Sequence, residues 1–207
     1  MTAILKVDTI QDTSGNNIIN ENANTITIGK SGDTTNIVGT LQNDGSDLSL
    51  NPITEVDQFR LTADLTNPGA ADITANLERV DDATFSKIGT GMSESSGIYT
   101  FPSTGVYRIQ AICHFYIPSG NDGACLVNTN ISSNSGGAYD LVASAIAGST
   151  AGGQLYNTHP SECFVNVTNA STFRVKFSTS SMAAAILVGS TNENQTSFSF
   201  IRLGDSQ

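Results

Sequence analysis

The sequence of 207 residues has no tryptophan and few cations: Lys and Arg together number nine, against nineteen Asp and Glu. Its formal net charge is therefore -10, although charged residues make up only 14% of the chain. Nucleic-acid binders need clustered cations to displace counterions from phosphates, and anionic membrane surfaces also attract cations. The charge argues against both partners and indicates an acidic, self-repelling surface.

Long apolar runs are also missing. The longest, Met182 to Val188, is far below the roughly 20 residues that span a bilayer. The start of the chain, Met1 to Lys6, lacks the basic region and the long apolar centre of a secretion signal. We therefore expect that the protein does not insert into a membrane and that it assembles in a cytoplasm.

Cysteine is scarce, and Cys113, Cys125 and Cys163 form an odd set without Cys-x-x-Cys spacing. This pattern favours buried, reduced thiols over the alternatives of one disulfide or a weak metal site.

Signals for catalysis are equally sparse. The chain has two histidines, no Gly-x-Ser-x-Gly elbow and no phosphate-binding glycine loop, so the sequence predicts no catalytic residue, no cofactor and no enzyme. No metal site is predicted; the best available ligands are His159, Glu162 and Asp122. The paired Asp81 and Asp82 are typical of a solvated turn. A carboxylate pair for sugar hydrolysis stays open, because its separation is spatial.

Strand patterns fill the rest of the chain. After Gly105 the apolar residues recur at every second position from Tyr107 to Phe115, which predicts a strand with one buried face. Turn residues at 102–105, 118–123 and 168–171 predict that this strand and its neighbours form hairpins. About ten short strands between residues 57 and 204 predict an all-β sandwich, and we choose a jelly roll. Met182 to Val188 is predicted to be a strand covered on both faces.

The N-terminal part of the chain, residues 1–56, has shorter and sparser apolar segments. Short pairs of Ile, Val and Leu alternate with Ser-Gly, Gly-Asp and Asp-Gly turns, too few to close a core in one chain. We expect equivalent strands from several chains to wrap around a common axis. Residues 57–207 form the second domain.

The segments Leu5 to Asn16 and Thr25 to Thr34 resemble the N-terminal segments of bacteriophage tail-fibre and appendage proteins. The resemblance implies an intertwined trimeric β-stem whose tip attaches to the virion, and therefore partners among other virion proteins.

The spacing Gly97-x-Tyr99 with Gly105-x-Tyr107-x-Ile109 resembles the central signature of the C1q and tumour-necrosis-factor-like family, and Ser197 to Leu203 resembles its last strand. The resemblance implies a homotrimeric jelly-roll head with the last strand at the trimer centre. It nominates five aromatic residues for the trimer core or interface: Tyr99, Phe101, Tyr107, Phe198 and Phe200.

Together these features predict a structural virion protein: a trimeric phage fibre whose head binds a host-surface glycan or protein. Tyr139 and Tyr156, flanked by Ser, Gly and Asn, and His159 before Pro160 are the candidate receptor-loop residues. Three alternatives remain: a capsid decoration or head-fibre protein without a receptor role, a C1q-like lectin, and a carbohydrate-cleaving depolymerase.

Overall fold

The computed structural model describes residues 38–39, 41–43, 46–47, 53–118, 122–149 and 153–207. The contacts divide the chain into two units, Met1–Ser49 and Leu50–Gln207, a few residues before the boundary predicted between residues 56 and 57. In the first unit the described residues form the antiparallel pair β1 (Gln42–Asn43) and β2 (Ser46–Asp47). The rest of the predicted stem lies outside the described residues.

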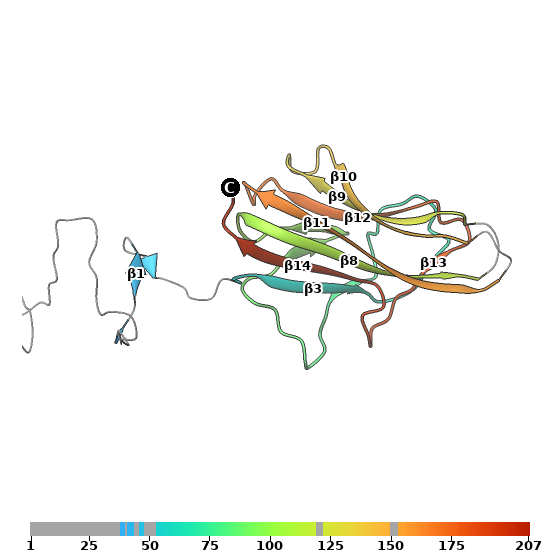
Figure 1. The fold of residues 1–207 in the computed structure, drawn as a ribbon, viewed down its shortest axis with the longest axis horizontal. Helices are drawn as coiled ribbons and strands as arrows, with labels where there is room; N and C mark the ends of the chain where they lie inside the picture. Colours follow the sequence, from blue (N-terminus) through green and yellow to red (C-terminus); the bar gives the residue numbers. More distant parts are fainter. Residues whose placement is uncertain (1–37, 40, 44–45, 48–52, 119–121, 150–152) are drawn as a thin grey trace, which may run out of the picture. The chain divides into compact units, whose positions relative to one another are not determined.

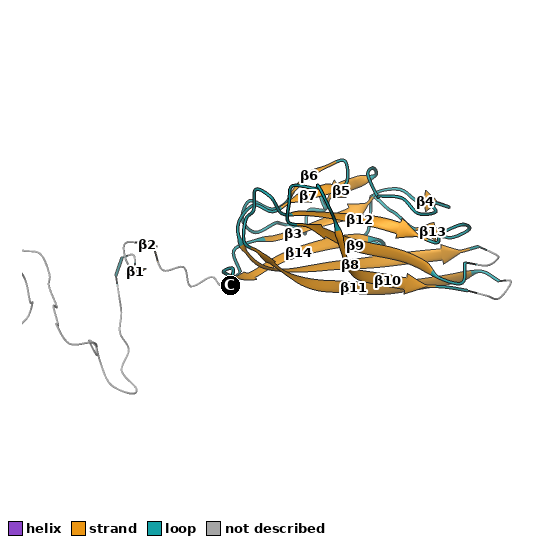
Figure 2. Ribbon diagram, turned by 90° about the horizontal axis from the view of Figure 1, so that it is seen from above, coloured by secondary structure: helices purple, strands orange, loops and turns teal. Residues whose placement is uncertain are grey.

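The second unit consists of two antiparallel sheets that pack face to face (Figures 1 and 2). The five-stranded sheet has the order β10 (Asp140–Ala147), β9 (Cys125–Ser132), β12 (Arg174–Ser180), β7 (Ile98–Thr100) and β6 (Ser93–Ser95). The seven-stranded sheet contains β3 (Val56–Leu61), β4 (Leu65–Thr66), β5 (Leu77–Arg79), β8 (Gly105–Ile117), β11 (Leu155–Val167), β13 (Ile186–Leu187) and β14 (Ser197–Gly204). Its central strand is β8, which pairs with β11 on one side and with β14 and β13 on the other. Within the described residues there is no helix long and apolar enough to cross a membrane.

The core between the sheets follows the predicted alternation. Every second residue of β8 from Gly105 to Ile117 is buried, as the pattern predicted. Phe198 of β14 stacks on Phe177 of β12, with 4.0 Å between ring centroids, so the two sheets meet through aromatic rings. Each fully buried aromatic side chain of this kind stabilises the fold by about 1.5–3 kcal/mol.

The predicted hairpins were wrong. β7 pairs with β6 and β12, whereas β8 lies in the other sheet, so residues 102–105 carry the chain between sheets. The steps from β8 to β9 and from β11 to β12 also change sheets. A tight hairpin joins β6 and β7 through Ser96 and Gly97, both at positive φ (51° and 80°), as a two-residue type I′ turn requires. The strands β9 and β10 also pair as a hairpin, through a longer connection. Turn residues mark where a strand ends, but they do not select the next strand's partner.

The apolar run from Met182 to Val188 was also predicted wrongly as one strand, because only Ile186–Leu187 pairs as β13. The carboxylate of Asp122 accepts hydrogen bonds from the backbone N–H groups of Ala183, Ala184 and Ala185, at 3.1, 2.8 and 2.5 Å. Asp122 is 3% exposed. A buried carboxylate with three amide donors replaces the ladder bonds of a strand here.

Charged residues are also buried at β3, which lies between β14 and β5 in the seven-stranded sheet. Asp57, 1% exposed, accepts from Arg79 Nε at 2.9 Å and from the backbone N–H of Met92 at 2.7 Å. Arg60 of β3 is only 3% exposed, and Glu78 and Asp81 bind its guanidinium.

Candidate functional site

Two aromatic side chains stand out on the outer side of β11, the edge strand beside β8 (Figure 1). Tyr156 is 60% exposed and Phe164 is 61% exposed, although both lie in a long, well-paired strand. Tyr156 stacks on its cross-strand partner Tyr116, with 4.4 Å between centroids and 16° between ring planes. We call the outward side of these two strands the β8–β11 face. Within the described part of the chain, no segment covers the rings of Tyr156 and Phe164.

Polar groups on the β8–β11 face pair with one another. Arg108 donates to Glu162, with 2.6 Å between Nη2 and Oε2. His114 Nδ1 lies 3.1 Å from Thr158 Oγ1. These pairs lie between the two aromatic positions, which are about 25 Å apart along β11 at the usual rise of a strand. The side chains in these two pairs already bind each other, so a partner can cover them without leaving them unpaired.

A second exposed apolar surface is the strand β10, at the neighbouring edge of the five-stranded sheet. Leu141, Val142 and Ile146 are 60%, 44% and 54% exposed. The register with β9 shifts between Leu141 and Ala143, so a bulge lies in the middle of this group. Long apolar edge strands are normally protected, because they expose unpaired backbone groups to other chains. We call this surface the β10 edge.

The thiols offer no nucleophile. All three cysteines are free; Cys113 and Cys125 are buried and Cys163 is partly buried. Burial raises the pKa of Cys113 well above its usual range and the pKa of Cys125 to about 11. Burial, with the nearby Glu162 carboxylate, raises the pKa of Cys163 to about 11. The free, buried or partly buried thiols agree with the favoured prediction, and the alternative of one disulfide is not formed.

The five aromatic residues nominated for a trimer core or interface lie inside one chain. Tyr99, Phe101, Tyr107, Phe198 and Phe200 are each 3% exposed or less. They form the core of the protomer and leave almost no surface for a neighbouring subunit. Of the two outward aromatic residues of β11, Tyr156 was nominated for a receptor loop, whereas Phe164 was not nominated for any site.

The three receptor-loop candidates do not come together. Tyr139 lies in the connection between β9 and β10, with Lys176 Nζ 4.5 Å from its ring centroid. Tyr156 and His159 belong to β11 and were wrongly placed in a loop. Tyr156 pairs with Tyr116 at the C-terminal end of β8, while Tyr139 precedes Asp140, which pairs with Ile131 near the end of β9. The register therefore places Tyr139 and Tyr156 at opposite ends of the sandwich.

The nominated metal ligands are equally separate. Glu162 pairs with Arg108, Asp122 binds backbone amides, and the ring of His159 lies 6.5 Å from that of Phe115. No group of three His, Cys, Asp or Glu suited to a metal ion occurs among the described residues. Asp81 pairs with Arg60, and Asp82 accepts from Thr84, so this pair forms a turn.

Two facing antiparallel sheets, between which the chain crosses repeatedly, as from β7 to β8 and from β8 to β9, define a jelly roll of the tumour-necrosis-factor-like fold, as expected from the sequence. The solved structures similar to this chain include murine APRIL at pH 5.0, with a TM-score of 0.53, 14% identity and coverage of 72% of this chain and 98% of that chain. Another is Eiger TNF from S. frugiperda, with a TM-score of 0.55, 10% identity and coverage of 76% and 96%. No family model and no curated protein sequence matches the chain.

Proposed function

We propose that this chain is the subunit of a homotrimer. The observation that carries the proposal is the exposure of Tyr156 and Phe164 on a sheet face where two pairs of polar side chains already bind each other. The exposed 61% of Phe164 corresponds to about 120 Å² of apolar surface, worth about 3 kcal/mol when buried. The sequence resemblance to C1q and tumour-necrosis-factor-like proteins supports the same assembly.

The two exposed surfaces suit a closed ring. A contact between different patches on each subunit is heterologous, and three such contacts close a ring with threefold symmetry. In this arrangement the β8–β11 face of one subunit contacts the β10 edge of the next. Each subunit then contributes both patches once, and no apolar edge remains open to aggregation.

The trimer serves as a bacteriophage fibre. The support is the resemblance of Leu5 to Asn16 and of Thr25 to Thr34 to tail-fibre proteins. Residues 1–56 form the stem that joins other virion proteins, and the jelly roll binds a molecule on the host surface without enzymatic turnover. Three copies convert a weak contact into useful avidity, which is a physical reason to trimerise a binding head.

The virion role is tested by antibody labelling and imaging of particles. Signal at the tail supports the receptor-binding fibre, whereas signal spread over the head supports a decoration or head-fibre protein instead. Release of sugars from host glycans by the purified protein would support the depolymerase.

Truncation tests the stem. The division between Ser49 and Leu50 indicates that the jelly roll is a self-contained unit. Removal of residues 1–50 is expected to leave a folded trimer that no longer joins the particle. Normal incorporation of the truncated protein would contradict the stem assignment.

A further inference from the structure

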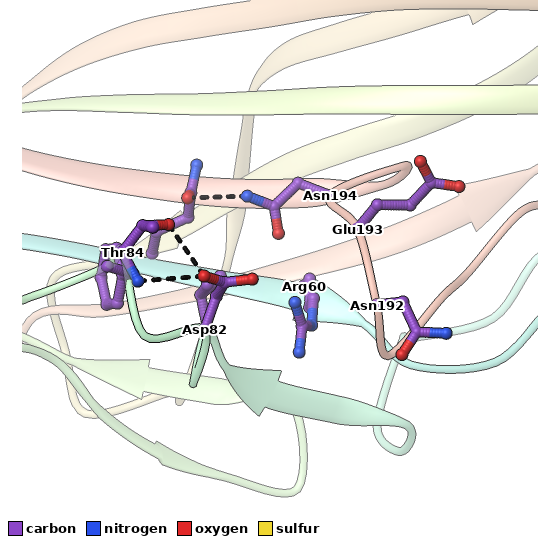
Figure 3. A pocket seen from close by; sticks show the side chains of 9 residues that line it. Arg60, Asp82, Thr84, Asn192, Glu193 and Asn194 are labelled. Carbon is purple, nitrogen blue, oxygen red and sulfur yellow. Dashed lines mark hydrogen bonds between the residues drawn. The ribbon is translucent and has the colours of Figure 1, made fainter.

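A polar hollow of about 280 Å³ lies over β3 (Figure 3). In the seven-stranded sheet, β14 and β8 lie between β3 and β11. One wall is the segment after β5, with Asp82, Thr84 and Phe85, and the other is the connection from β13 to β14, with Asn192 and Asn194. All its lining residues are described. The volume is slightly below the range for pockets of drug-sized ligands, about 300–1,000 Å³, so the hollow suits a smaller ligand.

The floor of the hollow presents a fixed hydrogen-bond donor. The Arg60 side chain is 4% exposed, and its Nε and Nη2 donate to Glu78 and Asp81, each at 2.6 Å. Its Nη1 donates to no described residue. Figure 3 shows the guanidinium between Asp82 and Asn192. A guanidinium held at two of its three nitrogens is pre-organised, so its free N–H groups are held ready for a ligand acceptor.

The walls add acceptors whose positions are also set. Asp82 Oδ1 accepts from the N–H and the hydroxyl of Thr84, at 3.0 and 2.8 Å, and these bonds lower the pKa of Asp82. Its Oδ2 has no partner among the described residues. Asn194 donates through Nδ2 to Gln58 at 2.9 Å, which leaves its Oδ1 free within the described part of the chain. The side-chain amide of Asn192 makes no hydrogen bond to a described residue.

The chemistry of the lining narrows the class of ligand. Asp81, Asp82, Glu78 and Glu193 outnumber Arg60 and repel anions. Arg60 at the floor disfavours a metal ion, and only Val80 and Phe85 offer apolar surface to a hydrophobic ligand. Hydroxyl groups both donate and accept, so a neutral sugar can satisfy the free donor and the free acceptors together.

We propose that this hollow binds one neutral sugar unit of a surface glycan. The proposal rests on the host-binding role proposed above and adds its location and its class of ligand. The site is distinct from the β8–β11 face and from Tyr139, Tyr156 and His159. It therefore replaces the receptor residues that the sequence suggested.

The test uses the purified full-length protein with glucose, galactose, fucose and N-acetylglucosamine as probes, in saturation-transfer NMR and titration calorimetry. Asn192→Trp places a large ring over the hollow, and Asp82→Asn keeps the shape of the wall while removing its charge. Gln154→Ala is the matched control, because Gln154 is exposed and makes no hydrogen bond to a described residue.

At least one neutral sugar is expected to bind with a dissociation constant in the millimolar range. Asn192→Trp should abolish the binding, Asp82→Asn should weaken it about 3- to 10-fold, as loss of one good hydrogen bond does, and Gln154→Ala should leave it unchanged. Absence of binding by all four sugars, or binding that survives Asn192→Trp, overturns the proposal. Tighter binding of sialic acid or glucosamine overturns the neutral class.

Host-cell binding by the same variants separates this proposal from the proposed function. If the wild-type protein binds host cells and Asn192→Trp does so equally well, the hollow is not the site and the receptor-binding role stands. If sugars bind in the hollow but the wild-type protein does not bind host cells, the sugar site stands and the receptor-binding role falls.

Discussion

Replacement of Phe164 by glutamate is expected to dissociate the trimer while leaving the jelly roll folded. Phe164 lies directly opposite Arg108 across the β11–β8 ladder, so the new carboxylate meets a cation within the same chain. The free energy of unfolding of one chain changes little, because the Phe164 ring is 61% exposed. The trimer loses about 3 kcal/mol of association free energy for each subunit. Summed over three chains, this lowers the association constant by roughly six orders of magnitude.

The assay is sedimentation velocity at about 1 μM, with circular dichroism to verify the fold. The wild-type protein should have three times the 21.6 kDa mass of one chain, and Phe164→Glu should have the mass of one chain with an unchanged spectrum. The matched control is Ile98→Glu. Ile98 is 39% exposed and lies opposite Lys176 in the five-stranded sheet, so it receives the same charge pairing away from the proposed interface. A monomeric wild-type protein, or a trimeric Phe164→Glu variant, would refute the reasoning.

Three further predictions concern the buried polar groups. Asp57→Ala should lower the free energy of unfolding by about 2–3 kcal/mol in urea titrations, because Arg79 and the Met92 N–H lose their acceptor; an effect below 0.5 kcal/mol would show that water replaces it. Asp122→Ala should lower the free energy of unfolding by about 2–4 kcal/mol, because three backbone N–H groups lose their carboxylate acceptor. Asp122→Asn should lower it less, because the amide oxygen still accepts, and equal losses for both variants would contradict this account. The thiols should resist dithionitrobenzoate at pH 8 until the protein unfolds. Burial raises the pKa of Cys125 and Cys163 to about 11, so the contribution of these thiols to the free energy of unfolding is complete below about pH 9 and is lost as the pH rises toward 11. A free energy of unfolding that stays constant over that pH window in urea titrations would contradict this prediction.

The sequence was informative where a property depends on neighbouring residues. The side chains of a strand alternate between its faces, so the buried face of Gly105–Ile117 could be predicted from spacing alone. The start of β3 near Asp57 was predicted for the same reason, whereas the last strand, Ser197–Gly204, was indicated by the resemblance to C1q and tumour-necrosis-factor-like proteins. Turn residues and many short strands were sufficient for the all-β class, and the resemblance to C1q and tumour-necrosis-factor-like proteins pointed to the jelly roll.

The candidate sites could not be predicted in this way. Burial of Arg60 depends on Glu78 and Asp81, and the rim of its hollow includes Asn192 and Asn194, more than 100 positions later in the chain. The exposure of Phe164 depends on β11 being an edge strand. Neither fact is encoded in the spacing of residues near Arg60 or Phe164.

The amino-acid sequence by itself determined the strand period, the inward side of each core strand, the acidic surface and the fold class. Only the tertiary structure decided that Ile98–Thr100 and Gly105–Ile117 lie in different sheets, that Asp122 binds Ala183 to Ala185, and that an aromatic face is left uncovered. The physical reason is that a strand's own residues specify which face is buried, whereas its partners are chosen by packing among segments far apart in the chain.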